Sequence, residues 1–319
     1  MKFFRSTPYH LLLGALFAVS VFICFATPIG GSFNDVVTLK MNNVANVTPV
    51  KATITTTSYD SVTKKFYNAK DLYGIERRIL VDRSEDLKIG DVIVADCSYL
   101  SSESYFDVLR IERINPAITF PLIQGLGELG RNMLFHVPMS MVAFIAFLLA
   151  MIYSIMFLRK KNMEYDFKAR ASSAIGLMFT ILATVTGSIW ARFSWGTFWN
   201  WDPRETSIFI LLLIYIAYFL LRSLLEDGEE KKARIAAVYN IISFLPMIFL
   251  IFVLPRITQS LHPGSSGTEA PVINLSGKTH TDPILTYILW TNVLLFTLLF
   301  LWIKELYTIV LRKEFSVND

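Results

Sequence analysis

The chain has 319 residues, of which 53% are hydrophobic and only 18% charged, and its net charge is +4 from 30 Lys and Arg against 26 Asp and Glu. Soluble domains carry about 25% charged residues, so this composition excludes an ordinary soluble globule. It also excludes a disordered chain, because so much apolar surface would not stay in water. The small net charge gives no indication of nucleic-acid binding. The two cysteines, Cys24 and Cys97, form no disulfide framework and no redox or zinc motif.

Six apolar stretches are each close to the roughly 20 residues that cross the hydrocarbon core of a bilayer. They are residues 11–27, 137–158, 171–191, 205–221, 235–254 and 284–303. Lys and Arg gather before the first stretch and after the second, fourth and sixth, whereas the short loops of the other face carry only Arg192 and Arg204, then Arg256 and Lys278. Because basic loops stay on the cytoplasmic side, both termini are predicted to be cytoplasmic. Residues 28–135, 192–204 and 255–283 are then predicted to lie outside.

The first apolar stretch has the position of a signal peptide. Its run is longer than the hydrophobic part of a typical signal peptide, and Thr27-Pro28 is a poor cleavage context. We therefore expect residues 1–30 to form a retained membrane anchor. Residues 136–319 would then supply the other five helices of a polytopic α-helical membrane protein.

Residues 31–117 have a different pattern from the rest of the chain. β-Branched and aromatic residues alternate with polar ones at 51–57, 92–97 and 109–112, and turn residues separate these stretches. This pattern is typical of a small antiparallel β domain of about five strands, inserted in the first outer loop. Five short strands suit an OB-like barrel or a similar small sandwich, and the pattern does not choose between them. Residues 118–135 are predicted to be an interfacial helix or linker.

The second outer segment of the predicted topology, with the end of the apolar stretch before it, is unusually rich in tryptophan. Four of the six tryptophans lie within twelve residues, at Trp190, Trp195, Trp199 and Trp201. Large flat rings at a membrane surface can form a platform for a flat apolar ligand. Two flanking cations, Arg192 and Arg204, could pair with carboxylates of such a ligand in a forked geometry. The alternative is an aromatic belt, in which the rings only mark the membrane interface.

The end of this segment carries the pattern of a helix start. Asp202 can cap the next helix, Pro203 suits its first position, and Glu205 completes a capping box. We therefore assign these three residues to structure before ligand contact.

Two of the four histidines bracket the tryptophan segment at the same predicted face of the membrane. His136 begins the second apolar stretch, and His262 follows the fifth. Neutral imidazole is a good axial ligand for haem iron. A single interfacial histidine is more often a polar anchor, but two beside a tryptophan platform favour ligation. His10 lies at the cytoplasmic end of the first stretch and His280 in a polar loop, and neither is expected to be a ligand.

The segment that carries these tryptophans resembles a motif of a known family. Residues 176–206, which end in the run WGTFWNWDPRET, resemble the tryptophan-rich WWD motif of haem-handling membrane proteins. The best match is the haem exporter C family (CcmC) of cytochrome c maturation, with the related CcsA proteins. That family has six spans, cytoplasmic ends, the WWD loop between spans 3 and 4, and one histidine in each flanking outer loop. His136 and His262 occupy those positions here, and the resemblance covers about residues 130–303 and the first span.

The resemblance implies a function in the bacterial inner (cytoplasmic) membrane. Family members hold b-type haem non-covalently at the outer face between two histidines and the tryptophans. They promote its transfer to a periplasmic haem chaperone (CcmE-like), together with a small CcmD-like subunit and an ABC transporter module. Such a protein binds and orients the haem, while the cofactor carries the reactivity, so no enzymatic activity is expected.

The sequence departs from the family in its first outer loop, which is normally short and here carries the β domain. The haem chaperone itself has an OB-like fold and binds haem through a histidine. This chain has no histidine between His10 and His136, so the domain is not a fused chaperone with that chemistry. It either docks a partner or shields the platform, or it is a stable spacer with no contact to haem, and these interpretations stay open.

Three other functions compete with this interpretation. A CcsA-type cytochrome c synthase subunit would be expected to have more spans and further histidines inside the membrane. A scaffold that anchors the β domain without haem explains the spans but not the tryptophan segment with its paired histidines. A membrane enzyme or transporter usually has ionisable residues within its spans, and the six predicted stretches have almost none.

Overall fold

The computed structural model describes residues 7–60, 64–100, 105–122, 127–225, 228–262 and 283–318. Contacts within the chain divide it into two compact units. A helical unit comprises residues 1–17, 132–281 and 288–319, and a second unit comprises residues 18–131 and 282–287. The helical unit contains the tryptophans and histidines of the predicted site, and the second unit contains the β-strands.

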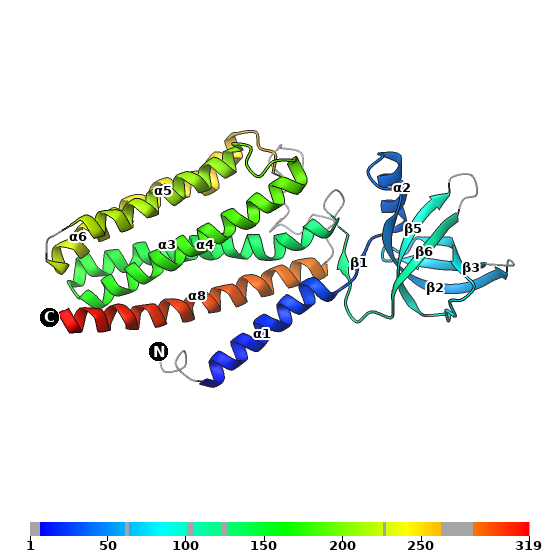
Figure 1. Ribbon diagram of the computed structural model, residues 1–319, viewed down its shortest axis with the longest axis horizontal. Coiled ribbons are helices and arrows are strands. Elements are labelled where there is room, and N and C mark those ends of the chain that lie inside the picture. The colour runs from blue at the N-terminus through cyan, green and yellow to red at the C-terminus, as the bar shows by residue number, and fades with distance from the viewer. Residues whose placement is uncertain are drawn as a thin grey trace. The chain divides into compact units, whose positions relative to one another are not determined.

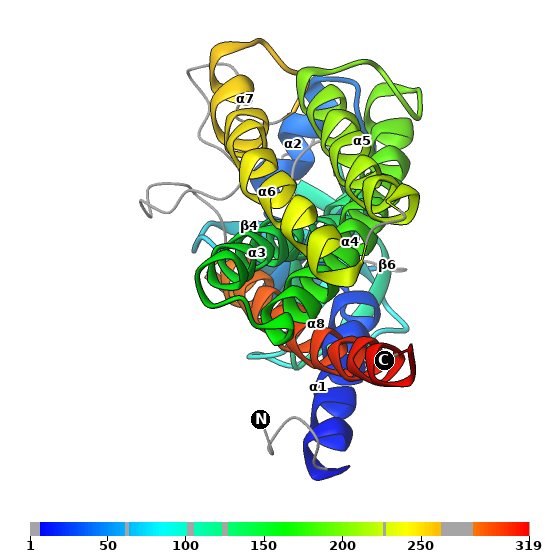
Figure 2. The same cartoon turned by 90° about the vertical axis from the view of Figure 1, so that its left-hand side faces the viewer.

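Six helices in the described part of the chain are long and apolar enough to cross a membrane. They are α1 (Thr7–Ala26), α3 (Gly130–Lys160), α4 (Met163–Trp195), α5 (Pro203–Leu224), α6 (Glu229–Ile248) and α8 (Pro283–Asn318). Within the helical unit, α3, α4, α5, α6 and α8 run alongside one another (Figure 1), and Figure 2 shows them nearly end on. The predicted polytopic helical architecture is therefore confirmed. Several helices are longer than the apolar stretches because polar residues at their ends continue the helical hydrogen bonding.

The fifth membrane helix changes geometry near its end. α6 contains Pro246, which has no N–H group to donate to the preceding turn. A π-helical turn follows at Phe249–Val253, and a short helix, α7, occupies Leu254–Ile257. Such π-turns are frequent at functional sites, and this one leads directly into the segment that carries His262.

The core of the helical unit combines aromatic rings with small residues that let the helices approach. The ring of Phe147 on α3 stacks on that of Tyr215 on α5, with centroids 3.5 Å apart. Gly176 on α4 leaves room for this pair, because a Cβ atom there would lie 2.7 Å from Cε1 of Phe147. The buried cluster includes Val142, Ala143, Ala146, Ile175, Phe179, Leu211, Phe244, Met247, Phe296 and Phe300.

Two forked ion pairs join helices at the start of α4. Arg222 of α5 donates to both carboxylate oxygens of Asp166 at 2.7 and 2.9 Å. Arg312 of α8 donates to both oxygens of Glu164 at 2.6 and 3.0 Å. Forked Arg–carboxylate pairs fix direction as well as distance, so these pairs hold α4 against α5 and α8 at the end opposite to its tryptophans.

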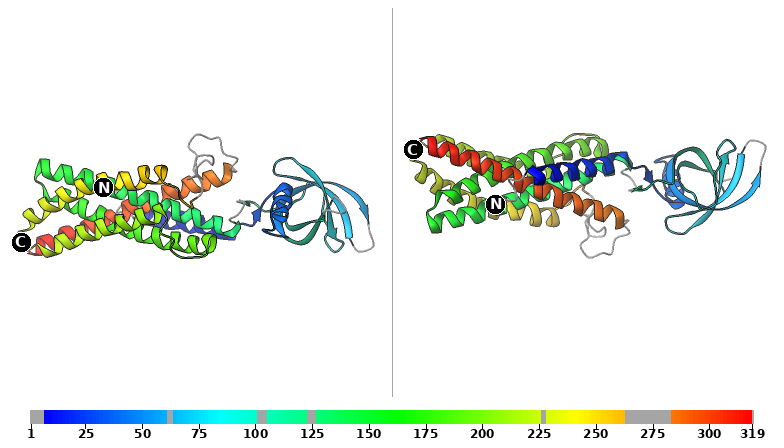
Figure 3. Two further views of the ribbon diagram at one scale, coloured as in Figure 1. Left: turned by 90° about the horizontal axis from the view of Figure 1, so that it is seen from above. Right: turned by 90° about the horizontal axis from the view of Figure 1, so that it is seen from below.

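The second unit is built around a closed five-stranded barrel (Figure 3). Its strands are β2 (Thr48–Asp60), β3 (Lys64–Asp71), β4 (Glu76–Asp82), β5 (Val92–Leu100) and β6 (Tyr105–Ile114). They pair in the order β2-β3-β4-β6-β5, and β5 returns to β2. The β4–β6 pair is parallel and the others are antiparallel. Of the two predicted alternatives, the structure is a barrel and not an open sandwich.

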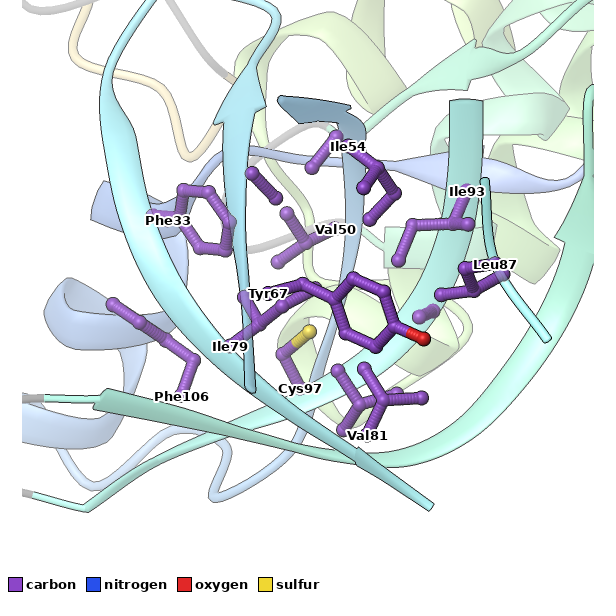
Figure 4. Packing of buried hydrophobic residues seen from close by; sticks show 14 of the residues in the cluster. Phe33, Val50, Ile54, Tyr67, Ile79, Val81, Leu87, Ile93, Cys97 and Phe106 are labelled. Carbon is purple, nitrogen blue, oxygen red and sulfur yellow. The ribbon is translucent and has the colours of Figure 1, made fainter. Parts of the chain in front are cut away.

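The barrel interior is filled by alternate residues of its strands. Val50, Ala52 and Ile54 of β2 all point inward and are buried, as the two-residue period of a strand requires. Figure 4 shows how the inward side chains surround Tyr67, which is 1% exposed. The interior is therefore a packed core and not an open ligand cavity, and its labelled members include Phe33, Ile79, Val81, Leu87, Ile93, Cys97 and Phe106.

A helix that the sequence analysis did not predict contributes to this core. α2 (Phe33–Met41) begins at Ser32, whose hydroxyl accepts from the backbone N–H of Asp35, while the Asp35 carboxylate accepts from the N–H of Ser32. This reciprocal pair is a capping box. Phe33 and Val36 on its buried face pack into the barrel core, so the helix forms because its apolar face has a place to be buried.

Within the predicted interfacial helix or linker at 118–135, the described residues form two short elements before α3 begins. Phe120–Pro121 forms a short strand, β7, that pairs in parallel with β1 (Ile29–Gly30). A 3₁₀ turn occupies Gly127–Leu129, and α3 then starts at Gly130. His136 therefore lies in the second turn of α3 and not at its first residue.

Candidate functional site

The tryptophan segment begins on the last turns of α4. Trp190 and Trp195 belong to that helix, which ends because Gly196 adopts a left-handed φ of 87° and its N–H donates to the Arg192 carbonyl. Glycine adopts this conformation at little cost, which makes it a common helix end. The link from 196 to 202 then carries Trp199 to α5.

Trp201 has an unusual backbone conformation in this link. Its φ is 56°, in the left-handed region that bulky side chains rarely adopt. Its side chain is 69% exposed and meets Trp199 edge to face, with centroids 5.9 Å apart. Backbone strain of this kind persists where surrounding contacts enforce it and often marks a functional segment.

Asp202 holds the start of α5 and the segment after α7 together. As the N-cap of α5 it accepts a hydrogen bond from the N–H of Arg204 at 2.9 Å, and Glu205 completes the predicted capping box by accepting from the N–H of Asp202. Pro203 occupies the first position of the helix, as predicted. Its carboxylate also accepts from the Ser260 hydroxyl at 2.9 Å and from the Leu261 N–H at 2.7 Å. The residue that the sequence assigned to capping alone thus also joins two segments distant in the sequence.

These donors keep the buried carboxylate charged. Burial by itself would raise the pKa of Asp202, but the hydrogen bonds from Arg204, Leu261 and Ser260 hold that pKa below its ordinary value. Asp202 therefore presents a fixed negative charge to its neighbours at physiological pH.

The imidazole of His262 contacts this carboxylate through one nitrogen. Its Nδ1 lies 3.2 Å from Oδ1 of Asp202. Burial, together with the charge of Arg204, lowers the pKa of His262 to about 4, so the ring is neutral at physiological pH. Because a carboxylate only accepts hydrogen bonds, Nδ1 carries the ring hydrogen and Nε2 keeps a lone pair.

Two tryptophan rings lie against His262. The centroid of Trp195 is 5.0 Å from that of the imidazole, edge to face, and the centroid of Trp190 is 5.7 Å away. The two indoles also meet each other edge to face at 4.8 Å. The rings and the Asp202 contact together define the orientation of the imidazole.

His136 is oriented by the backbone of α4. Its Nδ1 lies 3.0 Å from the carbonyl oxygen of Ala183 and 3.2 Å from the hydroxyl of Thr186. A carbonyl only accepts, so in the neutral ring Nδ1 donates and Nε2 keeps a lone pair. The imidazole packs closely on Gly187, where a Cβ atom would lie 2.9 Å from its Cε1.

The turn of α3 that carries His136 is anchored to α8. Pro138 lies inside α3 and cannot donate to the carbonyl of Leu134 four residues earlier. The side-chain amide of Asn292 on α8 donates to that carbonyl at 2.9 Å instead. On the other side, the Asn132 amide donates to the Thr186 carbonyl at 2.9 Å, so the position of the histidine is fixed from two helices.

Both histidines line one cavity of about 330 Å³ between the helices. This volume is at the lower end of the range for small-molecule sites. Its wall is mostly apolar, with contributions from the π-helical turn at 249–253 and from the starts of α3 and α5. The lining residues are His136, Val137, Ser140, Met141, Ala143, Ala183, Thr184, Gly187, Ser188, Trp195, Trp199, Arg204, Glu205, Ser207, Ile208, Leu211, Leu250, Ile251, Pro255 and His262.

The structure brings together five of the eight predicted site residues in this wall: both histidines, Trp195, Trp199 and Arg204. Trp190 stands one ring away, against His262. Trp201 is not among the lining residues, but its ring meets that of Trp199 edge to face. Arg192 is exposed, donates to the Gly196 carbonyl and lies over the ring of Phe198, so it braces the end of α4.

The two remaining histidines of the chain were not predicted to be ligands. His10 on α1 stacks on the indole of Trp302 on α8, with centroids 4.7 Å apart. His280 lies outside the described residues.

Sequence reasoning missed three positions that shape the cavity. The sequence Ala-Thr-Val-Thr-Gly, which ends at Gly187, indicates a helix and nothing more. The role of Gly187 depends on the His136 ring that packs against it. Asn292 is a side-chain amide in an apolar run, which is a usable signal for an interhelical hydrogen bond. Asp202 was recognised as a cap, but its bond to His262 joins residues 60 positions apart.

The fold and the cavity define a polytopic membrane protein with a site in which two imidazoles line one cavity. The family model described as Heme exporter protein C matches residues 121–318. The chain belongs to this family.

Individual relatives agree with this assignment. Heme exporter protein C of Paracoccus denitrificans is 31% identical over 136 residues, which is 43% of this chain and 56% of the relative. That of Bradyrhizobium diazoefficiens is 31% identical over 188 residues, 59% of this chain and 67% of the relative. A protein named cytochrome c biogenesis protein CcsA from Pelargonium hortorum is 32% identical over 87 residues, 27% of each chain. The chain thus spans only a little over half the length of the first of these relatives.

Proposed function

We propose that this chain binds haem non-covalently in the cavity between His136 and His262 and hands it on during cytochrome c biogenesis. The observation that carries the proposal is that both imidazoles line one cavity, and that a hydrogen-bond acceptor at Nδ1 orients each ring. The names of the relatives, which refer to haem export and cytochrome c biogenesis, support the same role. The protein would act by binding and orientation and not by catalysis.

The chemistry of the cavity wall suits a porphyrin. Apolar side chains and the indoles of Trp195 and Trp199 offer faces for a flat apolar ring. Arg204 in the wall provides a cation for a propionate carboxylate. Haem bound here would be held by its iron at the imidazoles, while one side of the site stays near the exposed ring of Trp201, which suits a cargo that must leave again.

The wider setting follows from the family resemblance and the basic loops. We propose a bacterial inner-membrane protein with both termini cytoplasmic and the cavity at the outer face. The recipient of the haem would be a periplasmic CcmE-like chaperone, with a small CcmD-like subunit and an ABC transporter module as further partners. The Lys and Arg residues at 159–170 and 222–234, in the loops after the second and fourth apolar stretches, support this orientation.

We propose an OB-type fold for the barrel and a periplasmic location. The support is its strand order, in which the third and fifth barrel strands, β4 and β6, close the barrel in parallel. Docking of a partner and a spacer role remain alternatives for this domain. Deletion of residues 35–117 with unchanged haem transfer would remove the docking alternative.

The test is haem binding by the purified full chain. After supplementation with haemin, the wild type should show a Soret band that weakens greatly in His136→Ala and in His262→Ala, while His10→Ala, outside the cavity wall, serves as the matched control. Trp199→Ala and Trp201→Ala should loosen the haem or block its transfer. A colourless wild-type protein would refute the proposal, and equal damage from His280→Ala would refute the ligand assignment.

A further inference from the structure

The two histidines of the cavity are backed by chemically different acceptors. Nδ1 of His136 faces the neutral carbonyl oxygen of Ala183 at 3.0 Å, with the Thr186 hydroxyl at 3.2 Å. Nδ1 of His262 faces the carboxylate of Asp202 at 3.2 Å. The two rings therefore do not offer equivalent Nε2 atoms, although both line the same cavity.

A carboxylate behind an imidazole makes the ring a stronger electron donor than a carbonyl does. The partial transfer of the Nδ1 hydrogen toward a negative acceptor increases the electron density at Nε2 and strengthens its bond to a metal. A neutral backbone carbonyl fixes the ring in the same tautomer but adds less density. On this argument His262 is the stronger ligand.

The carboxylate behind His262 is itself held in place. Asp202 is 4% exposed, and its oxygens accept from the N–H groups of Arg204 and Leu261 and from the hydroxyl of Ser260. The Ser260 hydroxyl also accepts from the backbone N–H of His262 at 3.2 Å. The segment 260–262 is thus fastened to the start of α5, and the ring it carries is pre-positioned although it lies outside any helix.

We propose that the two imidazoles have different tasks: His262, backed by Asp202, is the ligand that retains the haem iron, and His136, backed by a carbonyl, is the ligand that is released first when the haem leaves. Asp202 is then a positioning residue that acts through His262. This inference rests on the proposed haem function and adds an order to the loss of the two ligands.

The test compares two carboxylate variants in the haem-loaded full chain. Asp202→Asn keeps the shape of the side chain and the ability to cap α5, because Asn and Asp are equally good N-caps, but it removes the negative acceptor. Glu230→Gln is the control, because it removes a carboxylate that pairs with Arg234 on α6 and does not line the cavity. The readouts are the rate of haem loss to a haem-scavenging apoprotein and the midpoint potential of the bound iron.

Asp202→Asn should release haem about 10-fold faster or more, as substitutions behind metal-bound histidines do. It should also raise the midpoint potential, because ferric iron loses the stronger donor. Glu230→Gln should leave both quantities unchanged. The unfolding temperature of Asp202→Asn shows whether the helix cap survived, and Asp202→Glu should recover part of the wild-type potential.

The ligand variants provide a second, independent readout. The haem that His136→Ala still binds should be high-spin and should convert to low spin with added imidazole, and His262→Ala should lose its haem at least 10-fold faster than His136→Ala. Equal rates for the two, or faster loss from His136→Ala, would overturn the proposed order, as would Asp202→Asn with the potential of Glu230→Gln. A wild type that takes up no haemin would instead refute the proposed function.

Discussion

The side-chain amide of Asn292 donates to the carbonyl of Leu134, 2.9 Å away, on the turn where Pro138 removes the backbone donor. Leu134 and Asn292 are both at most 1% exposed, so this carbonyl has no access to water. The contact links α8 to the turn of α3 that carries His136. A polar residue in the middle of an apolar helix is thus explained by a proline on its neighbour.

Asn292→Leu should destabilise the protein because a buried carbonyl would lose its donor. We expect a loss of about 1–2 kcal/mol in the free energy of unfolding, measured by denaturation of the purified protein in detergent. Thr297→Val is the control, because among the described residues the hydroxyl of Thr297 donates to the carbonyl of Val293 in its own helix. In a Pro138→Ala background, which restores the backbone donor, the cost of Asn292→Leu should shrink. An unchanged cost there would contradict the assigned pairing.

The buried pair of Arg222 and Asp166 should be sensitive to loss of one partner. Their side chains are 9% and 3% exposed, so Asp166→Asn leaves a buried guanidinium without its counter-charge, and we expect a loss of about 3 kcal/mol or more. The double variant Asp166→Leu with Arg222→Met should recover much of it. Glu230→Gln in the exposed pair with Arg234 should cost less than about 1 kcal/mol. Equal effects of Asp166→Asn and Glu230→Gln in the same unfolding assay would contradict this.

Cys97 should report the integrity of the barrel through its reactivity. Its side chain is 2% exposed, and burial raises the pKa of its thiol to about 12. In a Cys24→Ala background, iodoacetamide at pH 8.5 should label Cys97 only after denaturant is added, because the thiolate is the reactive form. Rapid labelling of the native protein, detected by mass spectrometry, would contradict the packed core.

The same shift predicts a pH dependence of barrel stability. The folded thiol stays protonated while the unfolded thiol, with an ordinary pKa of 9.0, ionises. The contribution of Cys97 is therefore fully present below pH 9 and is lost as the pH rises from about 9 to 12. Cys97→Ala should show a shallower fall in the free energy of unfolding over this window than the parent.

Gly187→Ala should separate haem binding from stability. The new Cβ would lie 2.9 Å from Cε1 of His136, so the ring must move away from the Ala183 carbonyl, and haem affinity should fall about 10-fold. Alanine favours the helix by up to about 1 kcal/mol over glycine, so stability should not fall. Gly14→Ala, where nothing lies within 4 Å, should leave haem affinity unchanged in the same titration. Normal affinity in Gly187→Ala would show that this contact does not position His136.

Much of this architecture could be predicted from local patterns. Apolar runs of membrane length predicted the six helices, and alternation predicted strands where β2, β5 and β6 lie. The helix start at Asp202 followed from its spacing to Pro203 and Glu205. The helix α2 was missed because its amphipathic face is short, and its stability comes from Phe33 and Val36 packing into the barrel.

The amino-acid sequence by itself determined which parts of this protein are helix and which are strand, the family to which it belongs, and the residue types available at its candidate site. Those features depend on periodicity, length and motif order, all of which are local. The tertiary structure alone decided that His136 and His262 line one cavity, and that a carbonyl stands behind one imidazole and a carboxylate behind the other. Such pairings join residues 47 and 60 positions apart, and only the packing of the helices brings them within hydrogen-bond distance.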